Sequence, residues 1–173
     1  VKTAVRINEL EPEMQGFMFT TKTREVRAFQ EFMSFYFQLN RDMFQTEGDS
    51  VACVAEKADL QQVLQLYHDM FFEGAIDLDE RGGDWKALDY GYTEGKYAMV
   101  TVGPWIWGHR EGNPERADVL DDTGITAIPV ASNGQPGTYM ELKPIMINKY
   151  TDDRNRSYQL LQEVTSKGFQ IKV

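Results

Sequence analysis

The stretch Glu94-Gly-Lys-Tyr-Ala-Met-Val-Thr-Val-Gly-Pro-Trp-Ile-Trp-Gly108 decides the fold of this chain. Gly95 is typical of the residue that follows a helix, where a positive φ is often needed. Residues 97–102 form a short apolar run rich in β-formers, which predicts a central strand. Gly103-Pro104 ends that run, and proline suits the first position of a helix because no hydrogen-bonded amide is required there. We therefore expect a buried strand that turns tightly into a short helix.

Two tryptophans follow this turn directly. Trp105 and Trp107 are two residues apart, so a helical segment would point them about 200° apart, one toward the core and one toward a cleft. A ligand beside the turn would meet free N–H groups at the helix start and a flat aromatic face. That pairing suits a sugar, which has hydroxyl groups and an apolar C–H face. The residue pattern alone equally allows both rings to be core anchors beside a tight turn.

Composition narrows the class of protein. The chain has 173 residues, 42% of them hydrophobic and 26% charged, which fits a globular α/β domain with one core or slightly more. Its net charge is −9, the wrong sign for a nucleic-acid-binding surface. Cys53 is the single cysteine, so the sequence offers no internal disulfide and no cysteine metal site. The sequence shows neither a signal peptide nor a transmembrane run.

Hydrophobic periodicity predicts most of the remaining elements. Glu11-Pro12-Glu13 resembles the first turn of a helix. The stripe through Val26, Phe29, Tyr36 and Leu39 predicts a helix over 24–40 that buries those side chains. Further along we expect a hairpin over 43–55, a helix over 57–74, a helix over 84–93 capped by Asp84, a polar loop over 108–123, strands over 124–130 and 139–148, and a helix to Val164 capped by Thr151 or Asp152, with Tyr158, Leu161 and Val164 inside.

The acidic residues give no metal site. His68, Asp69 and Glu73 do not share one helix face well enough to hold an ion. The loop over 77–83 lacks the register of oxygen ligands that a calcium loop needs. We therefore expect no metal and no cofactor.

The ordered series of motifs resembles a known family. The stretch "EGKYAMVTVGPWIW", followed by "GITAIPVASNGQPGTYMELKPIMIN" and a helix, is similar to the middle of bacterial and archaeal extracellular solute-binding proteins of the maltose-binding-protein-like type, which feed ABC sugar importers. The resemblance runs from about Asp84 to Val164, and residues 1–83 match in element order. It implies an α/β, periplasmic-binding-protein-like (type II) lobe with a mixed sheet flanked by helices, truncated relative to the two-lobe fold, since family members are about twice this length.

The resemblance also implies a division of the chain and a function. Residues 1–138 would form mainly one lobe of the clamp, and residues 139–173 the hinge strand and helix that return toward the other lobe. A sugar or related small solute would bind in the cleft between the lobes, outside the cytoplasm (in the periplasm or at the cell surface), and the closed form would meet the ABC permease. The ligand-binding residues expected on these grounds are Trp105, Trp107, Gly103, Glu141, Met140, Arg24 and Glu25.

Two departures from the family pattern bear on the ligand. The positions around Thr23, Arg24 and Glu25 lack the aromatic residue often found there, although Arg24 and Glu25 could still hydrogen-bond a ligand. Tyr139, Met140 and Glu141 stand where family members often carry glycines. These bulky residues could reach into the ligand site or narrow it.

Other functions stay open at this level. The sequence contains none of the common nucleophile, P-loop, zinc-protease or dinucleotide motifs, so we expect no enzyme. Scattered carboxylates leave a carbohydrate-active enzyme as a weaker alternative. A protein-interaction or structural α/β domain without a small ligand is the stronger one. A lone lobe would also leave apolar surface uncovered, which favours pairing of two copies of the chain.

Overall fold

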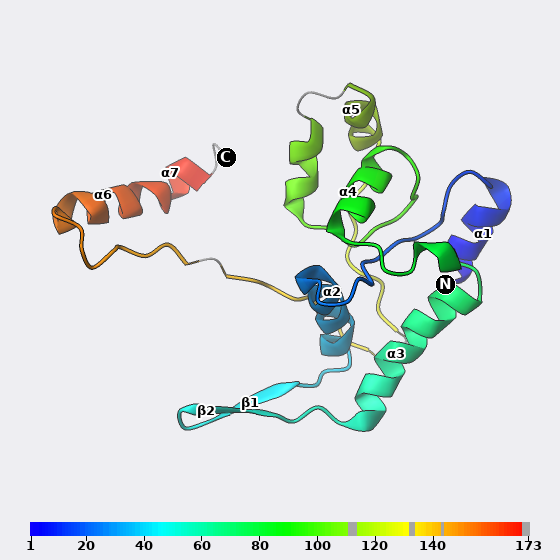
Figure 1. Ribbon diagram of the computed structural model, residues 1–173, viewed down its shortest axis with the longest axis horizontal. Helices are drawn as coiled ribbons and strands as arrows, with labels where there is room; N and C mark the ends of the chain where they lie inside the picture. Colours follow the sequence, from blue (N-terminus) through cyan, green and yellow to red (C-terminus); the bar gives the residue numbers. More distant parts are fainter. Residues whose placement is uncertain (111–113, 132–133, 143, 171–173) are drawn as a thin grey trace. The chain divides into compact units, whose positions relative to one another are not determined.

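The computed structural model describes residues 1–110, 114–131, 134–142 and 144–170, and it divides the chain into two compact units, Val1–Tyr139 and Met140–Val173. Figure 1 shows the order of the elements along the chain. The first unit contains α1 (Lys2–Leu10), α2 (Val26–Phe37), β1 (Phe44–Glu47), β2 (Ser50–Cys53), α3 (Lys57–Phe72), η1 (Leu78–Glu80), α4 (Trp85–Thr93), η2 (Pro104–Arg110) and α5 (Pro114–Asp121); the second contains α6 (Arg154–Val164) and α7 (Lys167–Gln170).

The N-terminal segment differs from its prediction. Helix α1 precedes Pro12 instead of starting at it, and its C-cap residue Glu11 has left the helical conformation. A proline disfavours the helical conformation of the residue before it, so Pro12 marks a helix end here. The chain then turns back closely on α1 at Gly16, where a Cβ atom would lie 2.1 Å from the Ala4 carbonyl oxygen. Only a residue without a side chain fits this contact.

The segment around Gly16 runs parallel to the predicted central strand. Parallel bridges join Gln15 to Tyr97 and Met18 to Val100. The Gln15 N–H donates to Lys96 O at 2.8 Å, and the Met18 N–H donates to Met99 O at 3.0 Å. The run at 97–102 pairs with the early segment through these two bridges but forms no strand. Tyr97 is buried, Met99 and Val100 are half-buried and Val102 is exposed, so the expectation of a buried central strand is wrong.

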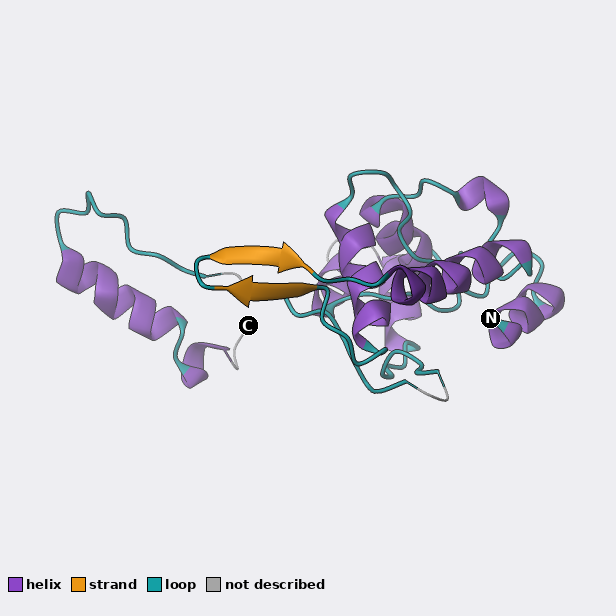
Figure 2. Cartoon of the chain, turned by 90° about the horizontal axis from the view of Figure 1, so that it is seen from below, coloured by secondary structure: helices purple, strands orange, loops and turns teal. Residues whose placement is uncertain are grey.

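The middle of the first unit follows the periodicity closely. The predicted hairpin is present as β1 and β2, antiparallel, with Phe44 opposite Cys53 (Figure 2). Helices α2, α3 and α4 lie within their predicted ranges. Gly74 and Gly95, after α3 and α4, have φ values of 79° and 78°, which confirms that both stops need the left-handed region. Asp84 caps α4 by accepting from the N–H groups of Lys86 and Ala87.

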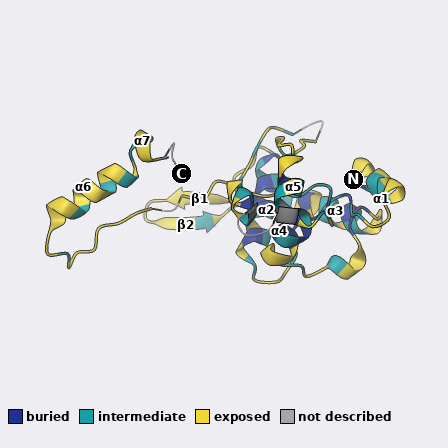
Figure 3. Ribbon diagram, turned by 90° about the horizontal axis from the view of Figure 1, so that it is seen from above, coloured by how far each residue is buried: buried dark blue, intermediate teal, exposed yellow. Residues whose placement is uncertain are grey.

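Most of the described buried hydrophobic residues form two clusters in the first unit. The larger joins α1, the 17–19 segment, the end of α3 and α4 through Met18, Phe19, Ile76 and Leu88. The smaller lies between α2 and α3 around Met33, Tyr36 and Val63. Figure 3 colours the buried residues of these elements dark blue. The larger cluster thus anchors α4 through Leu88, and the smaller anchors α2 through Met33 and Tyr36.

The polar stretch over 108–123 is not a loop throughout. Helix α5 begins at Pro114, and its Leu120 is buried. The Thr123 hydroxyl lies 2.8 Å from the Tyr92 hydroxyl of α4. The charge density of the stretch hid this helix, because a single buried leucine is too little for a periodic signal.

The second unit has helices but little burial. Asp153, one residue later than expected, caps α6 by accepting from the Arg156 N–H. None of the residues of this unit whose side chains the structure describes is buried (Figure 3). Tyr158 is exposed and Leu161 and Val164 are half-buried, so the expected interior face of the last helix is wrong for this chain. The described residues of 124–130 and 139–148 are not strands, because a strand needs a hydrogen-bonding partner along its length.

Candidate functional site

The candidate site is built on the turn that leads into η2. Pro104 is the first residue of that 3₁₀ helix, as its missing N–H allows. Trp105 follows with 52% of its surface exposed, and its indole Nε1–H donates to Asp89 Oδ2 of α4 at 3.0 Å. The Arg27 guanidinium carbon of α2 lies 5.1 Å from the centroid of the same ring. Three segments distant in sequence therefore meet at this tryptophan.

The other residues of η2 face in different directions. Ile106 is buried and Trp107 is half-buried, so the expectation that one tryptophan faces the core is wrong. A 3₁₀ helix turns about 120° per residue, so three successive side chains point three ways and only one of them faces the core. That residue is Ile106. Both indole rings consequently keep part of their surface in solvent.

Gly103 is explained by the space that the Trp105 ring occupies. A Cβ atom at Gly103 would lie 2.0 Å from Trp105 Cζ3. The absence of a side chain at Gly103 therefore lets the indole ring pack against the backbone.

A buried polar network lies beneath the ring. Arg27 donates from NH1 to Asp89 Oδ1 at 2.6 Å and from NH2 to Thr101 O at 2.7 Å. Its Nε lies 3.5 Å from Glu31 Oε1. Glu31 also accepts from the Thr20 N–H at 2.7 Å, from the Thr20 hydroxyl at 2.5 Å and from the Thr101 hydroxyl at 2.7 Å. One cation and two carboxylates thus share the interior with hydroxyl and backbone partners.

Burial and hydrogen bonding act on Glu31 in opposite directions. Burial raises the pKa of this carboxyl above its ordinary value. The hydrogen bonds from Thr20 and Thr101 and the charge of Arg27 lower the pKa, and burial outweighs them. Asp89 is fully buried and also faces His109, whose Nε2 lies 3.5 Å from Asp89 Oδ2. The His109 ring in turn packs edge-on against Tyr90, with centroids 5.2 Å apart.

Sequence reasoning missed the residues of this network. Arg27, Glu31, Ser34 and Gln38 are buried, whereas Val26 and Phe29, which we expected inside, are exposed. The missed residues recur at intervals of four, three and four along α2, which is itself a helical stripe. That polar stripe was the signal, and it was overlooked because the apolar residues of α2 were assumed to mark its inner face.

Arg24 and Glu25 lie at the start of α2, next to this network in sequence. Arg24 is exposed and has a φ of 65°, which is uncommon for a residue other than glycine. Glu25 is half-buried and occupies the N-cap position without a side-chain capping bond. The preceding Lys22 pairs with Asp84 at 2.9 Å, which raises the pKa of Lys22 and lowers the pKa of Asp84.

Met140 and Glu141 belong to the second unit, of which they are the first residues, and both are exposed. The neighbouring Tyr139 belongs to the first unit. Its N–H donates to the Ser34 hydroxyl at 3.0 Å, and its ring packs edge-on against Phe29. Of the seven expected site residues, the structure thus brings Trp105 and Gly103 into direct contact. It places Trp107, Arg24 and Glu25 in the same unit, and Met140 and Glu141 in the other.

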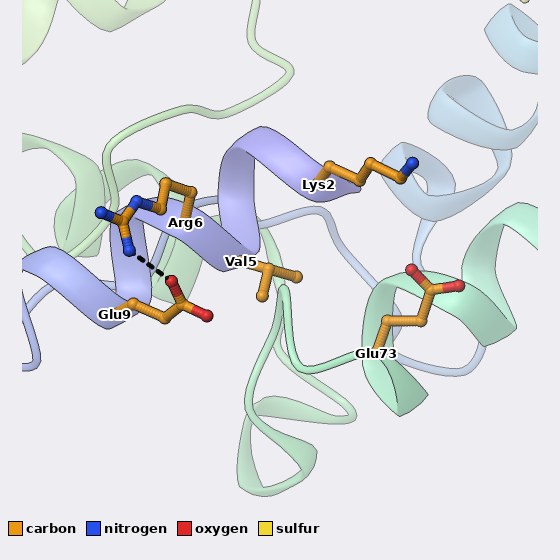
Figure 4. A pocket seen from close by; sticks show the side chains of 5 residues that line it. All are labelled: Lys2, Val5, Arg6, Glu9 and Glu73. Carbon is orange, nitrogen blue, oxygen red and sulfur yellow. Dashed lines mark hydrogen bonds and ion pairs between the residues drawn. The ribbon is translucent and has the colours of Figure 1, made fainter.

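The pocket in Figure 4 lies away from this site. It has a volume of about 270 Å³ and is lined by Lys2, Val5, Arg6 and Glu9 of α1 and by Glu73. Arg6 and Glu9 pair with each other across an exposed helix face. Within the described part of the chain, no group of three or more His, Cys, Asp or Glu side chains could hold a metal ion. The same residues contain no helix long and apolar enough to cross a membrane.

Comparison with known proteins places the fold. No family model and no curated protein matches the sequence. Among solved structures, the chain is similar to an ABC-transporter solute-binding protein from Agrobacterium radiobacter K84, solved with ribitol, with a TM-score of 0.69 and 14% identity over 99% of this chain. It is similar to maltose-bound MalE3 of T. maritima, with a TM-score of 0.69 and 14% identity over 97% of this chain.

The chain spans 42% of the length of each of these two proteins. The extent of the match confirms the expected fold class and agrees with a partial chain. The protein described here therefore has the α/β fold of periplasmic-binding-protein-like solute-binding proteins, truncated relative to the complete two-lobe structure.

Proposed function

We propose that this chain is part of the substrate-binding component of an ABC transporter, which binds a sugar or related polyol in a cleft between two lobes and delivers it to the permease. The observation that carries the proposal is the half-exposed Trp105 ring, held by a buried carboxylate and a buried guanidinium. The fold adds support, because two of its structural neighbours were solved with ribitol and with maltose.

The proposed ligand site combines an aromatic face with polar groups. Trp105 would stack on the C–H face of the ligand, and Trp107 is the second ring. Gly103 leaves room for Trp105, and Arg24 and Glu25 would contact ligand hydroxyls. Met140 and Glu141 would contribute from the segment that crosses to the second lobe. The unusual φ of Arg24 suits this role, because strained backbone gathers at functional sites.

The protein would act by binding and closure without turnover. Ligand would stabilise the closed form of the clamp, which the permease then recognises outside the cytoplasm. A single lobe lacks the opposite wall of the cleft, so we expect the 173-residue chain alone to bind more weakly than a protein with both lobes.

The test is a titration of the two-lobed protein with maltose, ribitol and a panel of other mono- and oligosaccharides. Tryptophan fluorescence is the readout. We expect a saturable change with at least one ligand and no product. Trp105→Ala should weaken binding at least tenfold, whereas Trp85→Ala, at the start of α4, should leave affinity unchanged. Equal affinity in Trp105→Ala and the wild type would remove the proposed role of this ring. No fluorescence change with any ligand of the panel would contradict the proposed function.

The exposed apolar residues of the second unit support a second candidate, a surface through which two copies of the isolated chain pair. Leu142, Ile145, Met146 and Leu160 are all exposed. Sedimentation over a range of concentrations tests this, since pairing predicts a rising average mass. A monomer at the highest concentration would contradict it.

A further inference from the structure

We infer that Asp89 and Arg27 are positioning residues, which hold the Trp105 indole in one orientation before any ligand arrives. The effect of this positioning on ligand affinity rests on the proposed function. The fixed orientation of the ring does not. Asp89 is fully buried and Arg27 nearly so, so neither side chain is accessible to a ligand. Their polar atoms are directed at Trp105, at each other and at the backbone before the turn.

Asp89 joins the ring to the interior through its two oxygens. Oδ1 accepts from Arg27 at 2.6 Å, and Oδ2 accepts from the Trp105 indole at 3.0 Å. The carboxylate therefore bridges Arg27 and the indole, and His109 Nε2 also lies 3.5 Å from Oδ2. A hydrogen bond to a charged acceptor is stronger than one between neutral groups, so this bond stabilises one orientation of the indole ring.

Arg27 constrains the same ring from a second direction. Its guanidinium lies 5.1 Å from the ring centroid while NH2 binds Thr101 O, two residues before Gly103. The guanidinium is planar and forms its bonds in a fixed geometry, so the backbone before the turn and the ring after it are held by one rigid group. Glu31, which accepts from the Thr101 hydroxyl, is a further charged partner of this group, with Oε1 3.5 Å from Arg27 Nε.

The turn itself provides the third constraint. The absence of a side chain at Gly103 lets the indole pack directly on the backbone. A half-exposed tryptophan without such contacts would sample several rotamers and would lose that freedom on binding. Holding one rotamer in advance removes this loss, which corresponds to roughly a two- to tenfold gain in affinity.

Asp89→Asn tests the structural part without any ligand. Arg27 and Trp105 donate to different oxygens of Asp89, and asparagine replaces one of these oxygens with an NH₂ group, so one of the two bonds is lost. The remaining oxygen should face the Arg27 cation and leave the indole N–H without an acceptor. The readout is the indole N–H signal of Trp105 in a ¹⁵N-labelled chain, assigned with Trp105→Phe. We expect its hydrogen exchange to accelerate at least tenfold, while the signals of Trp85 keep their wild-type behaviour. Unchanged exchange at Trp105 would overturn the inference.

A matched control and a second variant complete this experiment. Asp69→Asn removes a carboxylate on α3, away from the network, and should leave the Trp105 signal as in the wild type. If Asp89→Asn does not fold, Arg27→Lys serves instead, because lysine keeps the charge but lacks the planar group. It should accelerate Trp105 exchange too, and an unchanged signal there would count equally against the inference.

A double-mutant cycle separates positioning from direct binding. With maltose or ribitol as the probe, whichever the two-lobed protein binds, Asp89→Asn should weaken affinity roughly two- to tenfold in the wild type. It should have no effect in a Trp105→Phe background, because that ring lacks the N–H group. A loss that persists there would show that Asp89 acts by another route. If neither probe binds while Trp105 exchange responds, the proposed function fails and the positioning role stands.

Discussion

The two units of the chain differ in what their apolar residues do. In residues 1–139, apolar side chains from Ala4 to Tyr97 close two cores that involve α1, α2, α3 and α4. In residues 140–173, α6 and the segment before it border a pocket of about 450 Å³ whose lining is mainly aliphatic, and none of the described side chains is buried. A helix and one extended segment are too small to enclose a core. Apolar content therefore gives stability only where enough chain surrounds it.

The largest expected effect concerns two ion pairs of the first unit, one buried and one exposed. Arg27→Met leaves two carboxylates buried without their cation and should lower the free energy of unfolding by about 3–5 kcal/mol. Arg6→Met, which breaks the exposed pair with Glu9, should have no measurable effect. Urea unfolding of both variants followed by circular dichroism measures the contrast. Equal effects would show that burial does not determine how much these ion pairs contribute to the free energy of unfolding.

A second contrast concerns leucines. Leu88 on α4 is fully buried, whereas Leu160 on α6 is 64% exposed. Leu88→Ala should cost about 2–5 kcal/mol of unfolding free energy through lost burial and the cavity it leaves. Leu160→Ala should change it by less than about 0.5 kcal/mol. A substantial loss in Leu160→Ala would indicate that the second unit has a packed core in solution, and the comparison between units would then fail.

A smaller effect depends on pH. Because burial raises the pKa of Glu31, the folded state holds the proton of this carboxyl more tightly than the unfolded state does. The stability that Glu31 contributes is therefore complete below the ordinary value of 4.5 and is lost as pH rises through the folded-state pKa. Thermal unfolding at several pH values measures this.

Glu31→Gln should flatten the decline of stability above pH 4.5, since glutamine does not titrate. Glu163→Gln, on the exposed surface of α6, provides the matched control in the second unit and should keep the wild-type profile. A Glu31→Gln profile that runs parallel to the wild type across this range would contradict the direction given for Glu31.

The smallest effect is expected from removing the second unit. A chain that ends after Tyr139 retains every residue of both core clusters, including the Tyr139 ring beside the smaller one. Its thermal midpoint should match that of the 173-residue chain within experimental error. A clear drop would show that residues 140–173 support the first unit, and the two regions would then have to be treated as one.

Local patterns were enough to predict much of the fold. Helices α2, α3 and α4, the β1–β2 hairpin and the glycine stops after α3 and α4 all follow from periodicity and turn chemistry within a few residues. Pro12 was misread because a proline fits both before and after a helix end. The expected strands over 124–130 and 139–148 depend on partners elsewhere, and no local pattern shows whether a partner is present.

The sequence predicted only part of the candidate site, because local patterns do not show contacts between distant residues. Trp105 and Gly103 are neighbours in sequence, so their association is visible in the motif itself. Asp89 and Thr101 are 62 and 74 residues from Arg27, and only the folded chain brings them together. A charged residue on a helix that also carries apolar residues looks like solvent-facing surface, and this made the buried stripe of α2 hard to detect.

The parallel pairing of residues 15–18 with 97–100 has a consequence for synthesis on the ribosome. The early segment cannot find its partner until about 80 further residues have emerged, roughly 4–16 s at usual elongation rates. During that interval the apolar residues Phe17, Met18 and Phe19 lack the backbone partners at 97–100 and the core residue Tyr97. Nascent chains of this protein should therefore be most exposed to aggregation and to chaperone capture just before the Gly103-Pro104 turn leaves the exit tunnel.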